Sequence, residues 1–335
     1  MMRKLPIYVL GLVCFLISEM AVGQQFPMTN HYLINPYSLS PATAGSRDKG
    51  AFFFNYRKDW LNFGTSSPET IRFNTHFHIG NNMYLGAEAF MDKVDIFQRF
   101  KGSLSYTYRL QMAEEQYLHF GLWGSVYQNT INVDEIYGNP NDPLFNNLDQ
   151  LSKMTYNAGF GLVYYNRAFE VGLGMPTLLR TKDAYSYEVN DQLFDFEQEF
   201  QFHIANTFTL SPTLQLMPYA VIRRTSNQPT IIDVSASFIF GERFWISGLY
   251  RNSQVVAVGV GGELFNSMNL HYTYEVGVGG IHTKGGGSHE ITLGFRFGHQ
   301  KDDVKEMKQP RQKQKNRKYM LHDYQQMYEQ KYRRD

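Results

Sequence analysis

His76 and His78 are the residues whose types and spacing come nearest to a metal site in this 335-residue chain. Two residues apart on a β-strand, they point to the same side. A zinc site needs at least three protein ligands, and the spacing identifies no third one. His289 and Glu290 are neighbours and would face opposite sides of a strand. The pattern therefore favours polar lining of a barrel lumen, and we expect neither a metal nor a cofactor.

The motifs of common enzymes do not occur in the sequence. It has no Gly-x-Ser-x-Gly elbow, phosphate-binding loop or His-Glu-x-x-His pair. A lipid-cleaving barrel would need a serine and a histidine together on its lipid-facing surface, and no distinctive pair is present. The basic C-terminal tail lacks a nucleic-acid-binding module and belongs to an exported chain, so nucleic acid is not an expected partner. We predict a protein that is not an enzyme.

The elements that must position these residues are strands with one apolar and one polar side. In residues 288–297, isoleucine, leucine and two phenylalanines alternate with glutamate, threonine, glycine and arginine. A period of two predicts a strand. The same alternation predicts fourteen strands, at residues 50–60, 69–79, 83–92, 98–110, 116–128, 154–165, 168–175, 197–210, 214–224, 230–240, 243–251, 254–264, 268–278 and 289–298.

A soluble sandwich and a membrane barrel both show such alternation. Many of these segments are near ten residues long, as a tilted membrane strand requires, and Tyr, Phe or Trp recur near their ends. These features favour an all-β, antiparallel, up-and-down transmembrane β-barrel of about 14 strands over residues 49–300. An even strand number, with mostly short turns alternating with longer loops, predicts that both termini lie in the periplasm of an outer membrane.

The first 23 residues have the pattern of a signal peptide, which predicts that the protein is exported. Arg3 and Lys4 precede an apolar run too short to span a membrane, and Ala21-Val22-Gly23 fits a signal-peptidase site. We expect Gln24 to begin the mature protein. The only cysteine, Cys14, lies within the signal peptide, so the mature chain can form neither a disulfide framework nor a cysteine-based zinc site.

Two irregular segments flank the predicted barrel. Residues 24–48 contain prolines unsuited to a central strand and are a candidate plug. Residues 301–335 carry 11 Lys and Arg against 6 Asp and Glu, a net charge of +5, whereas residues 24–300 carry 19 against 24, a net charge of −5. This tail is either disordered or a short helix on which Tyr324, Tyr328 and Tyr332 form a stripe. We expect a periplasmic tail whose tyrosines contact a partner.

Several short motifs occur in order along the chain. They include Asn-Pro followed by Pro-Ala-x-Ala-Gly near the predicted mature start, Tyr-Arg-x-x-Trp in the first strand, and Trp-x-x-Gly-x-Tyr-Arg later. Through them the chain resembles one family of Bacteroidetes outer-membrane proteins, PorP/SprF, from about residue 24 to 298. Ser40 and Glu275 depart from residues usual in that family. The signature residues are Asn35, Pro36, Pro41, Ala42, Gly45, Arg57, Trp60, Trp245, Gly248, Tyr250, Arg251, Tyr272, Tyr274, Ser288, His289 and Glu290.

The resemblance implies a non-enzymatic component of the type IX secretion and gliding machinery. Such a protein assists the export or surface retention of adhesin-like cargo proteins. Its expected partners are periplasmic and outer-membrane secretion components, a secreted cargo protein and outer-membrane lipid. The alternative is an outer-membrane channel for diffusion or uptake of small solutes, since a barrel of fourteen strands can enclose a pore unless it is plugged.

Overall fold

The computed structural model describes residues 27–131, 152–184, 192–226, 228–241, 243–265, 267–279 and 283–299. The predicted signal peptide and the whole predicted tail, residues 301–335 with Tyr324, Tyr328 and Tyr332, lie outside these ranges. Within them, no helix is both long enough and apolar enough to cross a membrane.

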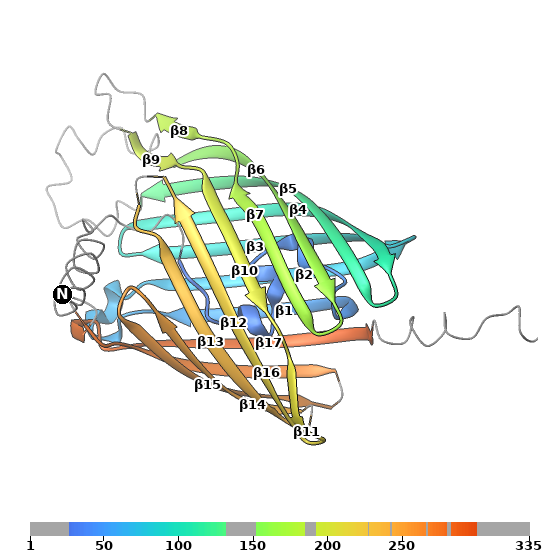
Figure 1. Cartoon of the computed structure of the whole chain (residues 1–335). Helices are drawn as coiled ribbons and strands as arrows, with labels where there is room; N and C mark the ends of the chain where they lie inside the picture. Colours follow the sequence, from blue (N-terminus) through green and yellow to red (C-terminus); the bar gives the residue numbers. More distant parts are fainter. Residues whose placement is uncertain are drawn as a thin grey trace, which may run out of the picture.

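A closed antiparallel barrel dominates the structure (Figure 1). β1 (Asp48–Lys58) pairs with β2 (Glu69–Gly80) on one side and with β17 (Ser288–His299) on the other. The remaining barrel strands are β3 (Met83–Val94), β4 (Phe97–Ala113), β5 (Gln116–Ile131), β6 (Ser152–Asn166), β7 (Phe169–Thr177), β10 (Glu199–Ala205), β12 (Leu214–Thr225), β13 (Ile231–Phe240), β14 (Phe244–Arg251), β15 (Val255–Leu264) and β16 (Met268–Gly277). β10 pairs with both β7 and β12 and so completes the ring. The predicted count of fourteen strands is confirmed among the described residues.

One predicted strand differs in detail. Residues 197–210 form β10 and then β11 (Phe208–Ser211), and both pair with β12. The break falls where the Asn206 side chain accepts a hydrogen bond from the Thr207 backbone, 3.0 Å away. Such local side-chain bonds compete with a regular ladder. The connection before β10, expected as a plain loop, contains a hairpin of β8 (Thr181–Ala184) and β9 (Gln192–Phe196).

The two ends of the barrel differ. At one end, the connections are turns of two or three residues, such as 81–82, 114–115, 167–168 and 212–213; we call it the short-turn end. The other, the long-loop end, carries the connections 59–68, 132–151, 178–198 and 278–287, together with a few short ones such as 95–96. Asp48 pairs with His299 at the short-turn end. The barrel therefore starts and finishes at the same end.

The two faces of the barrel follow the predicted alternation. Large apolar side chains point outward, where Leu104 is 73% exposed and Leu293 is 37% exposed. Polar side chains point inward, where Thr292, the neighbour of Leu293, is 1% exposed. The outer surface thus has the apolar character of a membrane-facing wall.

The N-terminal segment, residues 27–47, lies within the ring of strands (Figure 1). It contains three single-turn helices, η1 (His31–Leu33), η2 (Pro36–Ser38) and η3 (Pro41–Thr43). Pro36 and Pro41 occupy the first helical positions, where the missing backbone N–H costs nothing. Tyr32 and Leu33 pack in one apolar cluster with inward side chains of β12, including Tyr219 and Val221. The lumen is therefore a packed interior at these positions.

Candidate functional site: the occupied lumen

Arg57 of β1 is the centre of a buried ionic cluster at the long-loop end. One guanidinium nitrogen, Nη2, lies 2.6 Å from Oδ1 of Asp59 and 2.8 Å from Oε1 of Glu275. The other, Nη1, lies 3.1 Å from Oε2 of Glu290. β1 and β17 are neighbours because the barrel closes, and β16 is the next strand around the barrel. Residues far apart in the sequence therefore reach one guanidinium.

The carboxylates of Glu275 and Glu290 also bind the start of the N-terminal segment. The Asn30 backbone N–H donates to Oε2 of Glu290 at 2.9 Å, and its side-chain amide donates to Oε2 of Glu275 at 2.7 Å. The hydroxyl of Thr29 donates to Glu290 as well. Hydrogen bonds to ionised groups are about twice as strong as neutral ones, so these contacts are strong attachments for the segment.

A second buried guanidinium, Arg251 of β14, extends the cluster. Its Nε lies 2.7 Å from Oδ1 of Asp233, and its Nη2 donates to Oδ1 of Asn30 at 2.9 Å. Arg223 of β12 pairs with the same aspartate at 3.0 Å. A single residue of the segment, Asn30, thus contacts Glu275, Glu290 and Arg251.

We call Arg57, Asp59, Arg223, Asp233, Arg251, Glu275 and Glu290 the charged latch. It holds three cations and four carboxylates, and each of them has an opposite charge within 3.1 Å. Buried charges are tolerated only when paired and hydrogen-bonded, and removal of one partner leaves its neighbours uncompensated. The arrangement is therefore suited to holding a peptide segment in one position.

His31 lies beside the latch as a neutral group. Burial lowers the pKa of His31 to about 4; the carboxylate of Glu290 opposes this shift and the nearby Arg57 adds to it. The two ring nitrogens lie 2.6 Å from Oγ1 of Thr292 and 2.8 Å from Oγ1 of Thr273. The hydroxyls satisfy both nitrogens of the neutral ring at neutral pH.

On the opposite wall, the segment contacts β4 and β5 without ion pairs. The Tyr37 hydroxyl lies 2.7 Å from Oγ of Ser105, and the Thr107 hydroxyl donates to the carbonyl of Pro41 at 2.8 Å. A Cβ atom on Gly121 would lie 2.6 Å from Cα of Ala42. The backbone of η3 approaches β5 this closely because residue 121 has no side chain.

The signature residues divide between the two faces of the barrel and the N-terminal segment. The structure brings Arg57, Arg251 and Glu290 together in the charged latch. The other inward or buried members are Asn35, Pro36, Pro41, Ala42, Gly45, Trp245 and Ser288. Gly45 has a φ of 73° and faces the ring of Tyr84, two requirements that exclude a side chain.

The outward members are Gly248, Tyr250, Tyr272, Tyr274 and His289. The Tyr272 hydroxyl lies 2.6 Å from Nδ1 of His289, and the Tyr274 ring centroid lies 5.0 Å from that of His289. Trp60 lies at the long-loop end, where it is 41% exposed and adopts a left-handed conformation. The aromatic members of this set form part of the outer aromatic surface.

The two histidines considered first do not form a site. His76 is buried in the lumen and stacks on Tyr37, with ring centroids 5.5 Å apart, whereas His78 is exposed near the short-turn end. No group of three metal-ligating side chains occurs in the part of the chain that the structure describes.

Thr29, Asn30, His31 and Asp233 were not predicted as parts of the site. Only Asp233 carried a usable signal, because its alternation places it inward, three strands from Glu275 along the sheet order at the same end. The contacts of the irregular segment depend on closure of the barrel, which no local pattern encodes.

Comparison with known proteins identifies the family. Residues 21–295 match the model of the type IX secretion system membrane protein PorP/SprF. The chain belongs to the PorP/SprF family. It is therefore a non-enzymatic component of type IX secretion in the outer membrane, with partners among the components of that system. No curated protein sequence matches it.

Solved structures also resemble this PorP/SprF protein. The CymD monoaromatic hydrocarbon channel is 10% identical, with 83% of this chain and 96% of that chain aligned and a TM-score of 0.51. The P. putida toluene transporter TodX is 8% identical, with 82% and 95% aligned and a TM-score of 0.45. At such low identity the likeness to CymD shows the fold alone, a barrel resembling outer-membrane channels.

Proposed function

We propose that this PorP/SprF protein assists the export or surface retention of a particular cargo protein, as a closed barrel rather than an open pore. The observation that carries the proposal is the occupied lumen. The N-terminal segment crosses it from Met28, which accepts from Arg223 at 2.9 Å near the long-loop end, to Arg47 beside the short-turn end. A channel for small solutes needs continuous water along this path.

Conductance in planar bilayers tests the closed state. We expect the full mature protein to show no stable ionic current and a variant lacking residues 27–47 to conduct. Arg57→Ala, which retains the segment but disrupts the latch, should conduct intermittently. Equal currents from all three proteins would favour the small-solute channel instead.

Cargo handling is tested in cells. Deletion of the gene should remove a specific secreted protein from the cell surface, and crosslinking should capture that protein together with periplasmic components of the machinery. A deletion strain that secretes normally but fails to take up a solute would contradict the proposal.

We further propose that the short-turn end faces the periplasm, since outer-membrane barrels have short periplasmic turns. The end of β17 and the tail that follows then lie in the periplasm, where Tyr324, Tyr328 and Tyr332 would contact a periplasmic component of the secretion system. In that orientation Met28 lies at the outer mouth, whereas the even strand number by itself predicts both termini in the periplasm. Deletion of residues 304–335 should leave a folded barrel and reduce capture of periplasmic partners.

The cysteine-free mature chain permits a direct test of orientation. Thr65 lies in an exposed long-loop position and Thr213 in an exposed short turn. A membrane-impermeant maleimide should label Thr65→Cys on intact cells and should label Thr213→Cys only after the outer membrane is opened. The reverse pattern would invert the proposed orientation.

A further inference from the structure

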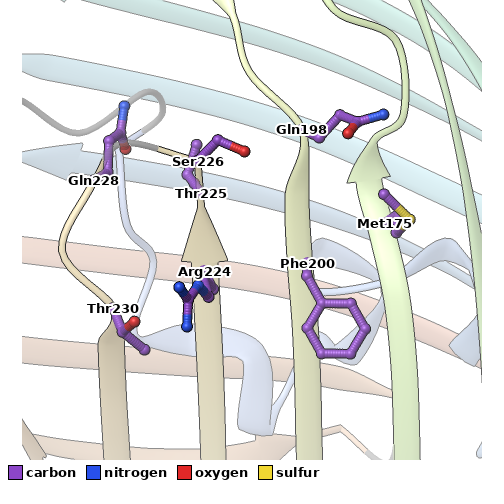
Figure 2. Close-up of a pocket in the computed structure, with 8 residues that line it drawn as sticks. All are labelled: Met175, Gln198, Phe200, Arg224, Thr225, Ser226, Gln228 and Thr230. Carbon is purple, nitrogen blue, oxygen red and sulfur yellow. The ribbon is translucent and has the colours of Figure 1, made fainter.

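An outward-facing cavity of about 590 Å³ lies at the long-loop end, on the side of β7, β10, β12 and β13 (Figure 2). Its lining residues are Met175, Gln198, Phe200, Arg224, Thr225, Ser226, Gln228 and Thr230. Adjacent strands are about 4.8 Å apart, so four strands span roughly 14 Å. The cavity is wide enough to hold a lipid headgroup rather than a single ion.

Arg224 carries the charge of this cavity. It lies directly opposite Phe200 in the β10–β12 ladder, and both side chains are on the outer face of the barrel. Its neighbours Arg223 and Thr225 point inward, and Arg223 pairs with Asp233 there. Among the described residues, no carboxylate forms an ion pair with Arg224.

A second outward cation at the same end shows the usual compensation. Nζ of Lys58 lies 2.6 Å from Oε1 of Glu69 on the neighbouring strand, so that charge is neutralised within the protein. An arginine on the lipid face is costly at the midplane of the bilayer and much less so near the interface. Arg224 is next to the last residue of β12, at the height where headgroups begin. An anion from the membrane is the natural partner for this guanidinium.

Further polar groups lie near Arg224. Nη2 of Arg180 donates to Oγ of Ser226 at 3.5 Å, which places a second guanidinium at the rim of the cavity. Nε of Arg180 is 3.4 Å from Oε2 of Glu197, so this cation is partly compensated. Ser226 and Gln228 supply further donors, while Phe200 and Met175 offer an apolar floor below them (Figure 2).

We propose that this cavity binds the phosphate-bearing headgroup of a membrane lipid in the leaflet at the long-loop end. Arg224 is the main contact to the phosphate, because planar guanidinium groups bind phosphate through two parallel hydrogen bonds. Arg180 is a weaker second contact, and Phe200 and Met175 pack against the first apolar atoms of the lipid. This proposal does not depend on the proposed role in cargo handling, which is tested by conductance and secretion measurements.

The test uses the full mature protein in nanodiscs of phosphatidylcholine that contain a minor fraction of labelled phosphatidic acid. We expect the wild type to bind phosphatidic acid selectively. Arg224→Gln should weaken this binding about tenfold and Arg180→Gln about threefold, since the loss of one charged contact changes affinity on that scale. Lys58→Gln is the matched control and should bind normally. Heat-modifiable migration on gels establishes that each variant is folded.

Two further arms separate the sources of the phosphate and the kinds of partner. Phe200→Ser should weaken binding of phosphatidic acid, and millimolar inorganic phosphate should not displace the lipid. Displacement by phosphate together with no effect of Phe200→Ser would overturn the proposal in favour of a free-phosphate site. Equal lipid binding by the wild type and Arg224→Gln would also overturn it, and crosslinks to a protein lost in that variant would then identify a protein-docking site.

Discussion

The two walls that hold the N-terminal segment use different physical means. On the wall formed by β12–β14, β16, β17 and β1, the charged latch binds Thr29 and Asn30 through ionised groups. On the β4–β5 wall, the segment meets neutral hydroxyls and the bare backbone of Gly121. The charged groups fix the positions of particular residues of the segment. Close packing on the β4–β5 wall limits the space between the segment and the barrel.

Single substitutions on the two walls should have different consequences. Loss of one latch charge leaves other buried charges without a partner, whereas a change on the β4–β5 wall alters only volume or a single neutral bond. We therefore expect the charged wall to be far more sensitive to single substitutions. Trp245 packs against the apolar cluster that contains Ile34, and Trp123 lies on β5 in the other wall, so both provide fluorescence signals close to the segment.

Arg57→Ala should have the largest effect. It leaves Glu275 and Glu290 buried with reduced compensation, and removal of one partner of a buried pair costs about 3–5 kcal/mol. Guanidinium-induced unfolding in detergent, followed by tryptophan fluorescence, measures the loss. Arg167→Ala removes an exposed pair with Glu115, N–O distance 2.9 Å, and should cost at most about 1 kcal/mol. Equal effects of the two substitutions would show that the latch is not needed for stability.

Gly121→Ala should have the next largest effect. The new methyl group would overlap η3 at Ala42, and overpacking typically costs about 1–3 kcal/mol. Labelling of a cysteine introduced at Ser38 should become faster, because the segment is displaced from the β4–β5 wall. Gly124→Ala adds a methyl group where no atom lies within 4 Å and should change neither measurement. A neutral Gly121→Ala would mean that the close contact does not position the segment.

Acidification should weaken the charged wall through His31. Its pKa is about 4 in the folded protein and 6.5 ordinarily, so the folded state favours the neutral ring. The stabilisation is complete well above pH 6.5 and falls as the pH is lowered toward 4, by about 1.4 kcal/mol at pH 5.5. His31→Gln should unfold with a flatter pH dependence across this window. An unchanged difference between the two proteins from pH 7.5 to 5 would contradict the assignment.

Tyr37→Phe should have the smallest effect. It removes the bond to Ser105 but keeps the ring stacked on His76, and one neutral hydrogen bond contributes about 0.5–1.5 kcal/mol. Ser105→Ala in the same background should cause little further loss, since the two hydroxyls form one interaction. A double variant that loses the sum of both single effects would show that the bond is not shared.

Much of the fold was predictable because alternation is a local property. Each of the fourteen predicted segments corresponds to a barrel strand, and the inward or outward side of residues such as Thr292 and Leu293 follows from parity. The hairpin β8–β9 was not predicted. Its strands are four and five residues long and too short for a period of two to be recognised.

The candidate site was predictable only in part. The motifs that carry the family resemblance include Arg57, Arg251 and Glu290, and parity places all three in the lumen. Parity does not show that they share one cluster, and the same motifs also contain Tyr250 and Tyr272, which lie on the outer face. Asn30, the residue of the segment with most contacts to the latch, lies in irregular chain without a period to interpret.

The sequence by itself determined the strands, their two faces, the absence of cysteine after residue 14 and the family. Only the tertiary structure decided that the segment before the first strand returns to fill the lumen. The physical reason is closure: β1 pairs with β17, which brings Arg57 to Glu290 across 233 residues, and the paired charges then present hydrogen-bonding groups that Thr29 and Asn30 satisfy. Those contacts form between groups that are distant in sequence, so local patterns cannot specify them.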